Sequence, residues 1–348
     1  MGKYTITESD INKNKDDILG ILKRNLPQQS EEIFDWKYKN CPYGKAVCLL
    51  AKDEESNSYV GSGSLFLRKV CIGGESVCAS VAGDFAIDKK HRAYGPALKL
   101  QKTIQSHLEG NEVKFIYGLP NKLSEAVFLR IGYTEVGRIE RYAKVLRSEY
   151  KIRGYIRFSL AARIVSKVLD YLIEKFSKET KHKDSSSFGI ETPDSFDNRF
   201  DALWKKAAGQ FEIVGERTSE FLNWRYIQCP PHRYHIFSLV DTKKEIAGYV
   251  VYFTENNIYY VVDMLFAHSN VLDTLLHKFI RYSRNQGIFS ISVFFMGSDS
   301  TVEKLKEWGF RLRESGSRVL LYCDRKLPFS DSLFDKNKWH LLEGDNDI

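Results

Sequence analysis

The pattern of apolar and polar positions predicts a chain of mixed helices and strands. Apolar side chains recur at helical spacing in residues 10–25, 91–108 and 271–286, which predicts amphipathic helices. Short apolar runs bounded by turn residues predict strands, of which the clearest are residues 46–52, 59–70, 76–87, 235–240, 245–254 and 258–266. Helices and strands alternate in both halves of the chain, so the pattern favours the α/β (α+β) class.

An internal repeat divides the chain. Residues 34–42 (FDWKYKNCP) return as residues 222–230 (LNWRYIQCP), with Trp, a base, Tyr and Cys-Pro in register. The offset of 188 residues is too long for a solenoid repeat and close to the length of a domain. Two later landmarks keep the same order in both halves: Asp84 with Asp263, and Gly132-Tyr133 with Gly309-Phe310. We therefore predict two related domains in tandem.

The domain bounds follow from composition. Residues 1–150 are predicted to form the first domain, 191–348 the second, and 151–190 a helix followed by a charged, Ser-rich linker. Within this connection, residues 155–178 form an amphipathic pattern with many basic residues. The favoured interpretation docks the apolar stripe on a domain and leaves the basic face in water. The alternative lays the helix on an anionic membrane surface as a peripheral contact.

Composition narrows the class of function. The chain is 43% hydrophobic and 28% charged, which is typical of a folded globular protein. Its net charge of +7 falls well short of a nucleic-acid-binding tail, so we expect no nucleic acid partner. The N-terminus has no apolar signal core, and no run approaches the roughly 20 apolar residues that span a bilayer. Six cysteines without paired spacing predict buried thiols in a reducing cytoplasm and no metal site.

One loop carries the residues expected of an anion site. Residues 86–98 (AIDKKHRAYGPAL) join an apolar strand to a helix through Lys89, Lys90 and Arg92. Pro96 suits the first turn of that helix, where its missing N–H costs nothing. Unpaired backbone N–H groups and the positive end of the helix dipole add to the three bases. The loop therefore predicts a site for a pyrophosphate.

Two motifs in this half resemble those of a known family. Arg92-x-x-Gly95-x-Ala97, after a strand, resembles the acyl-CoA pyrophosphate loop of the GNAT acyltransferases. Asn121-x-x-Ser124-x-x-x-Phe128-x-x-x-Gly132-Tyr133 is similar to the second motif of that family. The resemblance implies two tandem GNAT-like domains, each a mixed, mainly antiparallel twisted sheet flanked by helices. It also implies that acetyl-CoA, or another acyl-CoA, is the donor substrate.

The resemblance also assigns binding roles. The strand before the loop would pair with the pantetheine arm, the loop would hold the pyrophosphate, and Asn121 would contact the arm. Pro96 departs from the pattern because it removes one N–H from the phosphate cradle. The residues expected to bind the cofactor are Phe85, Ala86, Ile87, Arg92, Ala93, Tyr94, Gly95, Ala97, Asn121, Ser124 and Phe128.

The catalytic candidates are few. Asp84, beside the strand that would hold the thioester, is the candidate general base; the alternative is a structural hydrogen bond at a strand bulge, a role Asp263 would share. Phe128 stands where many family members carry a Tyr that protonates the leaving thiolate, and a phenyl ring cannot donate a proton. Tyr133 and Tyr94 are then the candidate acids, unless the thiolate leaves unprotonated.

The second half lacks the loop. Its strand is followed by residues 267–271 (AHSNV), without the Arg-x-x-Gly-x-Ala pattern, and Ser298 stands in the place of Asn121. We expect this half to shape an acceptor cleft or to stabilise the pair rather than to bind acyl-CoA. The aromatic residues of the repeat, such as Trp36 and Trp224, are expected to pack a helix end against each sheet.

These features together predict an N-acyltransferase that moves an acetyl or other acyl group from acyl-CoA to an amine. Tandem chains of this kind resemble bacterial enzymes of the cell envelope and of exopolysaccharide pathways, which implies an amino sugar or sugar nucleotide as acceptor. One alternative is aminoacyl transfer from a charged tRNA, as in peptidoglycan bridge ligases, against which the intact Arg92–Ala97 loop argues. Another is a non-catalytic binding or regulatory protein, which is favoured by Phe128 and by the absence of the Arg-x-x-Gly-x-Ala pattern from the second half.

Overall fold

The computed structural model describes residues 3–26, 28–92, 94–108, 112–148, 159–182 and 187–347. The first half holds β1 (Tyr4–Ser9), α1 (Lys15–Asn25), α2 (Glu31–Phe34), β2 (Val47–Asp53), β3 (Ser58–Ile72), β4 (Glu75–Ile87), α3 (Tyr94–Ser106), β5 (Phe115–Gly118), α4 (Lys122–Arg130) and β6 (Thr134–Val145). Two helices, α6 (Ser159–Lys175) and α7 (Lys178–Lys181), follow. The second half holds β7 (Gly189–Glu191), α8 (Asn198–Ala207), β8 (Ile213–Gly215), α9 (Ser219–Leu222), β9 (His235–Val240), β10 (Ile246–Glu255), β11 (Ile258–Phe266), α10 (Ser269–Asn285), β12 (Ser290–Gly297), α11 (Asp299–Glu307), β13 (Arg311–Cys323), α12 (Ser330–Leu333) and β14 (Trp339–Leu342).

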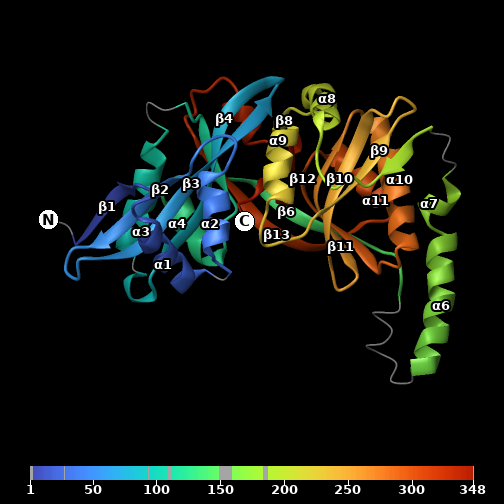
Figure 1. The fold of residues 1–348 in the computed structure, drawn as a ribbon, viewed down its shortest axis with the longest axis horizontal. Coiled ribbons are helices and arrows are strands. Elements are labelled where there is room, and N and C mark those ends of the chain that lie inside the picture. Colours follow the sequence, from blue (N-terminus) through green and yellow to red (C-terminus); the bar gives the residue numbers. More distant parts are fainter. Residues whose placement is uncertain are drawn as a thin grey trace.

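The described strands join in one mixed sheet that runs through both halves (Figure 1). Its order is β1-β2-β3-β4-β5-β13-β6-β12-β11-β10-β9-β7. The last long strand of each half lies in the other half's part of the sheet, because β13 pairs with β5 and β6 pairs with β12. The two halves are therefore tied together by backbone hydrogen bonds, and the predicted domain bounds stay a prediction.

Side-chain alternation places helices on both faces of the first-half sheet. Leu50 on β2 belongs to the core beneath α1, together with Leu22. Its neighbour Leu49 belongs to a separate core beneath α3, together with Leu100 and Ile104. Successive side chains of a strand point to opposite faces, so a strand buried on both sides reads as a continuous apolar run. The short apolar runs of the sequence predicted this correctly.

The two copies of the repeat contact each other. Each forms a single π-helical turn, Asp35–Lys39 in one and Asn223–Ile227 in the other. The Trp36 and Trp224 rings stack with their centroids 5.0 Å apart. Each indole N–H donates to the other residue's carbonyl, at 2.7 Å from Trp36 and 3.0 Å from Trp224. Both tryptophans also belong to a core with strand residues such as Tyr249 and Val251. The predicted packing of the tryptophans against a sheet is therefore confirmed, and the pair in addition seals the junction between the halves.

The favoured interpretation of the connecting helix fails where the structure describes its side chains, from Ser166 on. Residues 155–158 lie outside the described part, and α6 begins at Ser159. Figure 1 shows α6 standing off the end of the body, next to α7. Val168 is 56% exposed and Phe176 is 67% exposed, so the described end of the apolar stripe faces away from the sheet. The sequence showed that the helix is amphipathic, but it could not show which side the body would cover.

Candidate functional site

The ends of strands β4 and β5 diverge in the first half. The two strands are parallel but pair only over three residues, Ala79–Val81 with Phe115–Tyr117. β5 then ends at Gly118, whereas β4 continues to Ile87. A bulge interrupts the pairing of β4 with β3 at this point, and Asp84 takes a φ of 48°, which turns the strand. A gap therefore opens beside the last residues of β4.

A cavity of about 280 Å³ lies at this gap. Its walls come from β4, from the start of α3, from α4 and from the end of α1, so segments far apart in the sequence meet here. Seven residues predicted to bind the cofactor line it: Phe85, Ala86, Ile87, Arg92, Ala97, Asn121 and Ser124. The sequence did not predict the other four lining residues, which are Asn25, Leu26, Leu123 and Val127.

The loop of this cavity is held in place by its arginine. The Arg92 guanidinium donates to the Ile87 carbonyl (3.0 Å) and to the Asn25 side-chain oxygen (3.2 Å). The next helix, α3, has Gly95 and Pro96 in its first turn, and a Cβ at Gly95 would meet no atom within 4 Å. First-turn N–H groups have no acceptor within the helix, so they can bind an anion in that open space. Ala93 and the side chain of Tyr94 lie outside the described part.

Two predicted site residues lie in the hydrophobic core instead. Phe128 and Tyr133 are 2% and 3% exposed, and their ring centroids are 4.8 Å apart. Neither lines the cavity. Burial raises the pKa of Tyr133 above its usual range, and its buried hydroxyl has no hydrogen-bond partner among the described residues. The expectation that Tyr133 supplies the leaving-group proton is not supported, because its hydroxyl is enclosed away from the cavity.

Asp84 has a structural role that occupies both of its carboxylate oxygens. The Lys37 ammonium contacts Oδ1 at 2.9 Å, and the Tyr38 hydroxyl donates to Oδ2 at 2.8 Å. Asp84 itself is 6% exposed. The matching Asp263 is held in the same manner by a cation and a tyrosine, Arg217 (3.2 Å) and Tyr249 (3.1 Å). The structural alternative therefore describes both residues, and a role of Asp84 as general base stays a prediction.

A second carboxylate lies beside Asp84. The Asp347 carboxylate lies beside Asp84 and fills the space that a side chain at Gly83 would need. Its Oδ2 is 3.6 Å from the Lys37 ammonium, and the side chain is 20% exposed. Burial, together with the nearby charge of Asp84, raises the pKa of Asp347. This carboxylate is therefore suited to take up a proton.

Arg225, the repeat partner of Lys37, holds the segment that carries Asp347. Its guanidinium donates to the carbonyls of Gly344 and Asn346, each at 2.9 Å. The basic residues of both repeat copies thus converge on the same C-terminal segment. Sequence reasoning missed Asp347, because only the fold brings this residue to the repeated bases.

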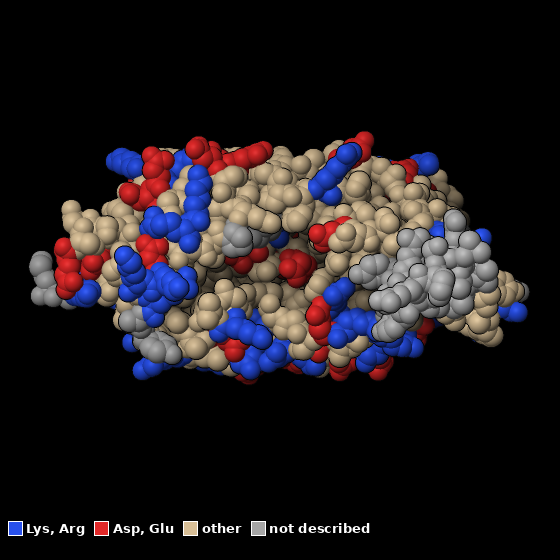
Figure 2. Space-filling view, turned by 90° about the horizontal axis from the view of Figure 1, so that it is seen from below, with Lys and Arg blue, Asp and Glu red and all other residues tan. Residues whose placement is uncertain are grey.

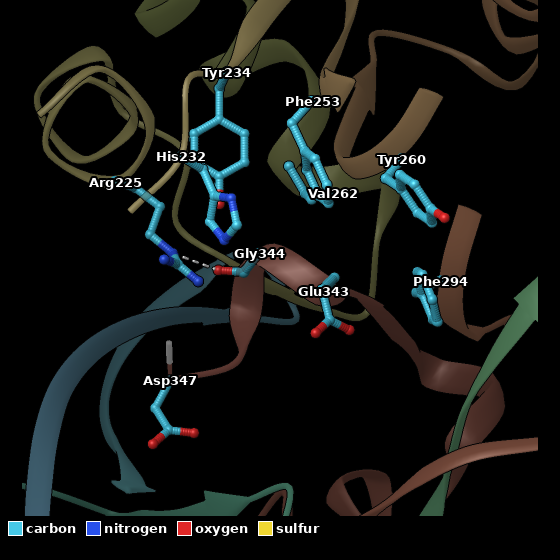
Figure 3. A pocket seen from close by; sticks show the side chains of 10 residues that line it. All are labelled: Arg225, His232, Tyr234, Phe253, Tyr260, Val262, Phe294, Glu343, Gly344 and Asp347. Carbon is cyan, nitrogen blue, oxygen red and sulfur yellow. Dashed lines mark hydrogen bonds between the residues drawn. The ribbon is translucent and has the colours of Figure 1, made fainter. Parts of the chain in front are cut away.

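A second cavity, of about 310 Å³, opens at Asp347 on the side of the second half. Figure 3 shows aromatic rings along one side of it and the carboxylates of Glu343 and Asp347 along another. Phe253 stacks on Tyr260 with centroids 5.0 Å apart, and burial raises the pKa of Glu343. Figure 2 shows a hollow in the middle of the molecule with acidic side chains deep within it. The pocket can therefore hold a cationic group beside a ring or an apolar body.

The corresponding gap in the second half is filled. Strands β11 and β12 pair over Ile258–Val261 and Ser290–Val293 and then diverge, as β4 and β5 do. The freed edge of β12 is taken by β14, which pairs over Phe295–Gly297. The buried His340 of β14 also donates from Nε2 to the Met264 carbonyl on β11, at 2.9 Å. The chain's own strand therefore occupies the place where the first half has its cavity.

The described residues show neither a metal site nor a membrane-spanning helix. Those residues hold no group of three or more His, Cys, Asp or Glu side chains arranged for a metal ion. Nor does the described part contain a helix long and apolar enough to cross a membrane.

Comparison with known proteins identifies the fold. No family model matches the chain, and no curated protein matches it in sequence. A GCN5-related N-acetyltransferase from Anabaena variabilis is 15% identical, with a TM-score of 0.66 over 92% of this chain and 72% of that one. A conserved protein of unknown function from Enterococcus faecalis, a probable N-acyltransferase, is 10% identical, with a TM-score of 0.65 and the same coverage of both chains.

A third solved structure extends the similarity. Saccharomyces cerevisiae N-myristoyltransferase with bound myristoyl-CoA is 13% identical, with a TM-score of 0.56 over 93% of this chain and 79% of that one. At such identities the likeness shows the fold alone. It confirms the predicted GNAT-like α/β fold, and each match extends over both halves of the chain.

Proposed function

We propose that the protein is an acyl-CoA-dependent acyltransferase whose donor binds in the gap between β4 and β5. The observation that carries this proposal is the meeting of seven predicted cofactor residues in one cavity at diverging strands. The pantetheine arm would lie along Phe85–Ile87, which pairs with no residue of β5. The pyrophosphate would bind at the first turn of α3, beside Arg92.

The acceptor in this proposal is a primary amine bound in the pocket beside Asp347. The neutral nitrogen attacks the thioester carbon, the C–N bond forms, and the C–S bond breaks to release the CoA thiolate. A backbone N–H of β4 stabilises the oxyanion, and the Asp347 carboxylate takes the proton of the attacking nitrogen. The aromatic side of the pocket favours an acceptor with a ring, in agreement with an amino sugar or sugar nucleotide.

The finer parts of the assignment are proposals too. We propose that the acyl group is acetyl and that residues 1–150 and 191–348 form the two domains. We also propose that the protein acts in the cytoplasm, in cell-envelope or exopolysaccharide metabolism. All six cysteines are free thiols and five of them are buried, which supports a reducing compartment. The cavity at Arg92 supports acyl-CoA over a charged tRNA as the donor.

The test is a thiol-release assay with acetyl-CoA and a panel of amino sugars and other primary amines. We expect amine-dependent release of CoA by the wild type and none by Gly95→Trp, whose indole would fill the open space at α3. Asn270→Trp, at the matching helix start of the second half, is the control and should retain activity. Binding of acetyl-CoA without release for any amine or for water would favour the non-catalytic alternative. No binding at all would exclude the donor site.

A further inference from the structure

Helix α6 turns its polar side toward the body of the protein. Ser166 is 2% exposed, and its carbonyl accepts a hydrogen bond from the Ser148 hydroxyl at 3.3 Å. One turn further on, the Asp170 carboxylate accepts the backbone N–H of Ser148. Residues four apart lie on the same face of a helix. The body therefore covers the face that carries Ser166 and Asp170.

The opposite side of α6 is apolar and exposed. Ten large hydrophobic side chains are exposed among the described residues, and five of them lie on α6 or directly after it: Val168, Leu169, Tyr171, Leu172 and Phe176. A soluble helix normally buries its apolar stripe against its own protein. An apolar patch of this kind marks a surface that a membrane or another molecule covers.

Basic side chains lie beside this apolar side where the structure describes them. Residues 151–183 contain nine Lys and Arg residues but only three Asp and Glu residues. Lys167, Lys175 and Lys181 are exposed. Two of these ammonium groups lie over apolar-face rings, Lys175 at 5.6 Å from the Tyr171 centroid and Lys181 at 5.6 Å from the Phe176 centroid. Long basic side chains beside aromatic rings are typical of a helix at a lipid–water interface.

We propose that α6 docks the protein on an anionic lipid bilayer. The helix lies in the plane of the headgroups, with Val168, Leu172 and Phe176 at the acyl boundary and the lysines among anionic headgroups. Its 17 residues and its charges place it on the bilayer surface rather than across the bilayer. A second copy is a poorer occupant, because it would bring two strongly basic segments together.

The experiment is co-sedimentation of the full chain with phosphatidylcholine vesicles, with and without phosphatidylserine. We expect the wild type to bind the mixed vesicles. Val168→Asp with Leu172→Asp should weaken this binding about tenfold or more, because it removes apolar insertion. Lys167→Glu with Lys175→Glu should weaken it by at least about tenfold, since each basic residue near an anionic surface contributes about 1 kcal/mol. Leu312→Asp, an equally exposed apolar site on β13, is the matched control and should bind as the wild type does.

The outcomes decide the proposal whether or not the protein transfers acyl groups, because the assay needs no donor. The proposal is wrong if the wild type binds neither vesicle, or if Leu312→Asp weakens binding as much as the α6 variants do. It is also wrong if sedimentation velocity shows a wild-type dimer that Val168→Asp with Leu172→Asp converts to a monomer. Circular dichroism spectra identical to the wild type would show that the variants remain folded.

Discussion

The gap between β4 and β5 and the gap between β11 and β12 show how a duplicated scaffold can diverge in function. Both pairs of parallel strands separate after a short stretch of pairing. In the first half the gap stays open as a cavity beside Arg92. In the second half β14 occupies it through pairing with β12 and through the bond from His340 to Met264. The geometry that could hold a pantetheine arm is thus kept in both copies but available in one.

Loss of the buried cation Arg217 in the second half should have the largest effect on the stability of the fold. Arg217→Met should destabilise the fold by about 3–5 kcal/mol, because it leaves Asp263 and Asp345 without their buried cation. Acetyl-CoA affinity should stay within about twofold of the wild type, since Arg217 does not line the donor cavity. Urea unfolding and calorimetry measure the two effects. A large loss of acetyl-CoA affinity in the folded variant would contradict the assignment of the donor site to the first half alone.

Asp347 should behave as a functional group rather than a structural one. Asp347→Asn should lower kcat by about 100-fold, because the amide cannot accept a proton. The same change should stabilise the fold at neutral pH. The raised pKa means that the folded protein prefers the neutral carboxyl, so this contribution is lost as the pH rises through that pKa. For the same reason the wild-type rate should rise with pH across this range.

The control for Asp347→Asn is Asp331→Asn, an exposed acidic residue in α12. It should change neither kcat nor stability. Unchanged kcat in Asp347→Asn would remove this carboxylate from the mechanism and leave Glu343 as the candidate base.

The strand that closes the second gap should make stability depend on pH. Burial lowers the pKa of His340 to about 4, so the folded state holds a neutral ring. Below the ordinary value of 6.5 the unfolded chain binds a proton that the folded chain does not. Stability should therefore fall as the pH drops from about 6.5 toward 4, by up to about 1.4 kcal/mol per pH unit. In His340→Gln this slope should shrink, and unfolding curves at several pH values would show it.

The tryptophan pair should respond equally in both halves. Trp36→Phe and Trp224→Phe each remove one indole N–H and leave one buried carbonyl without its donor. Each should cost about 1–2 kcal/mol in the free energy of unfolding. A clear inequality between the two variants would show that the junction is less symmetric than its hydrogen bonds.

Local chemistry was predictable from the sequence, whereas long-range placement was not. The loop from Arg92 to Ala97 and the block at Asn121 are local motifs, and the structure brings them to one cavity. Asp347 and β14 reach their places only through the fold, so no local pattern could indicate them. The amphipathic pattern of α6 was evident, but periodicity alone does not say which molecule covers the apolar face.

The central claim is that the chain has one donor site, in the first half. Calorimetry with acetyl-CoA on the wild type, Gly95→Trp and Asn270→Trp tests it most directly. We expect one site per chain in the wild type, unchanged binding in Asn270→Trp and no binding in Gly95→Trp. Two sites per chain, or binding that survives Gly95→Trp and is lost in Asn270→Trp, would contradict the account.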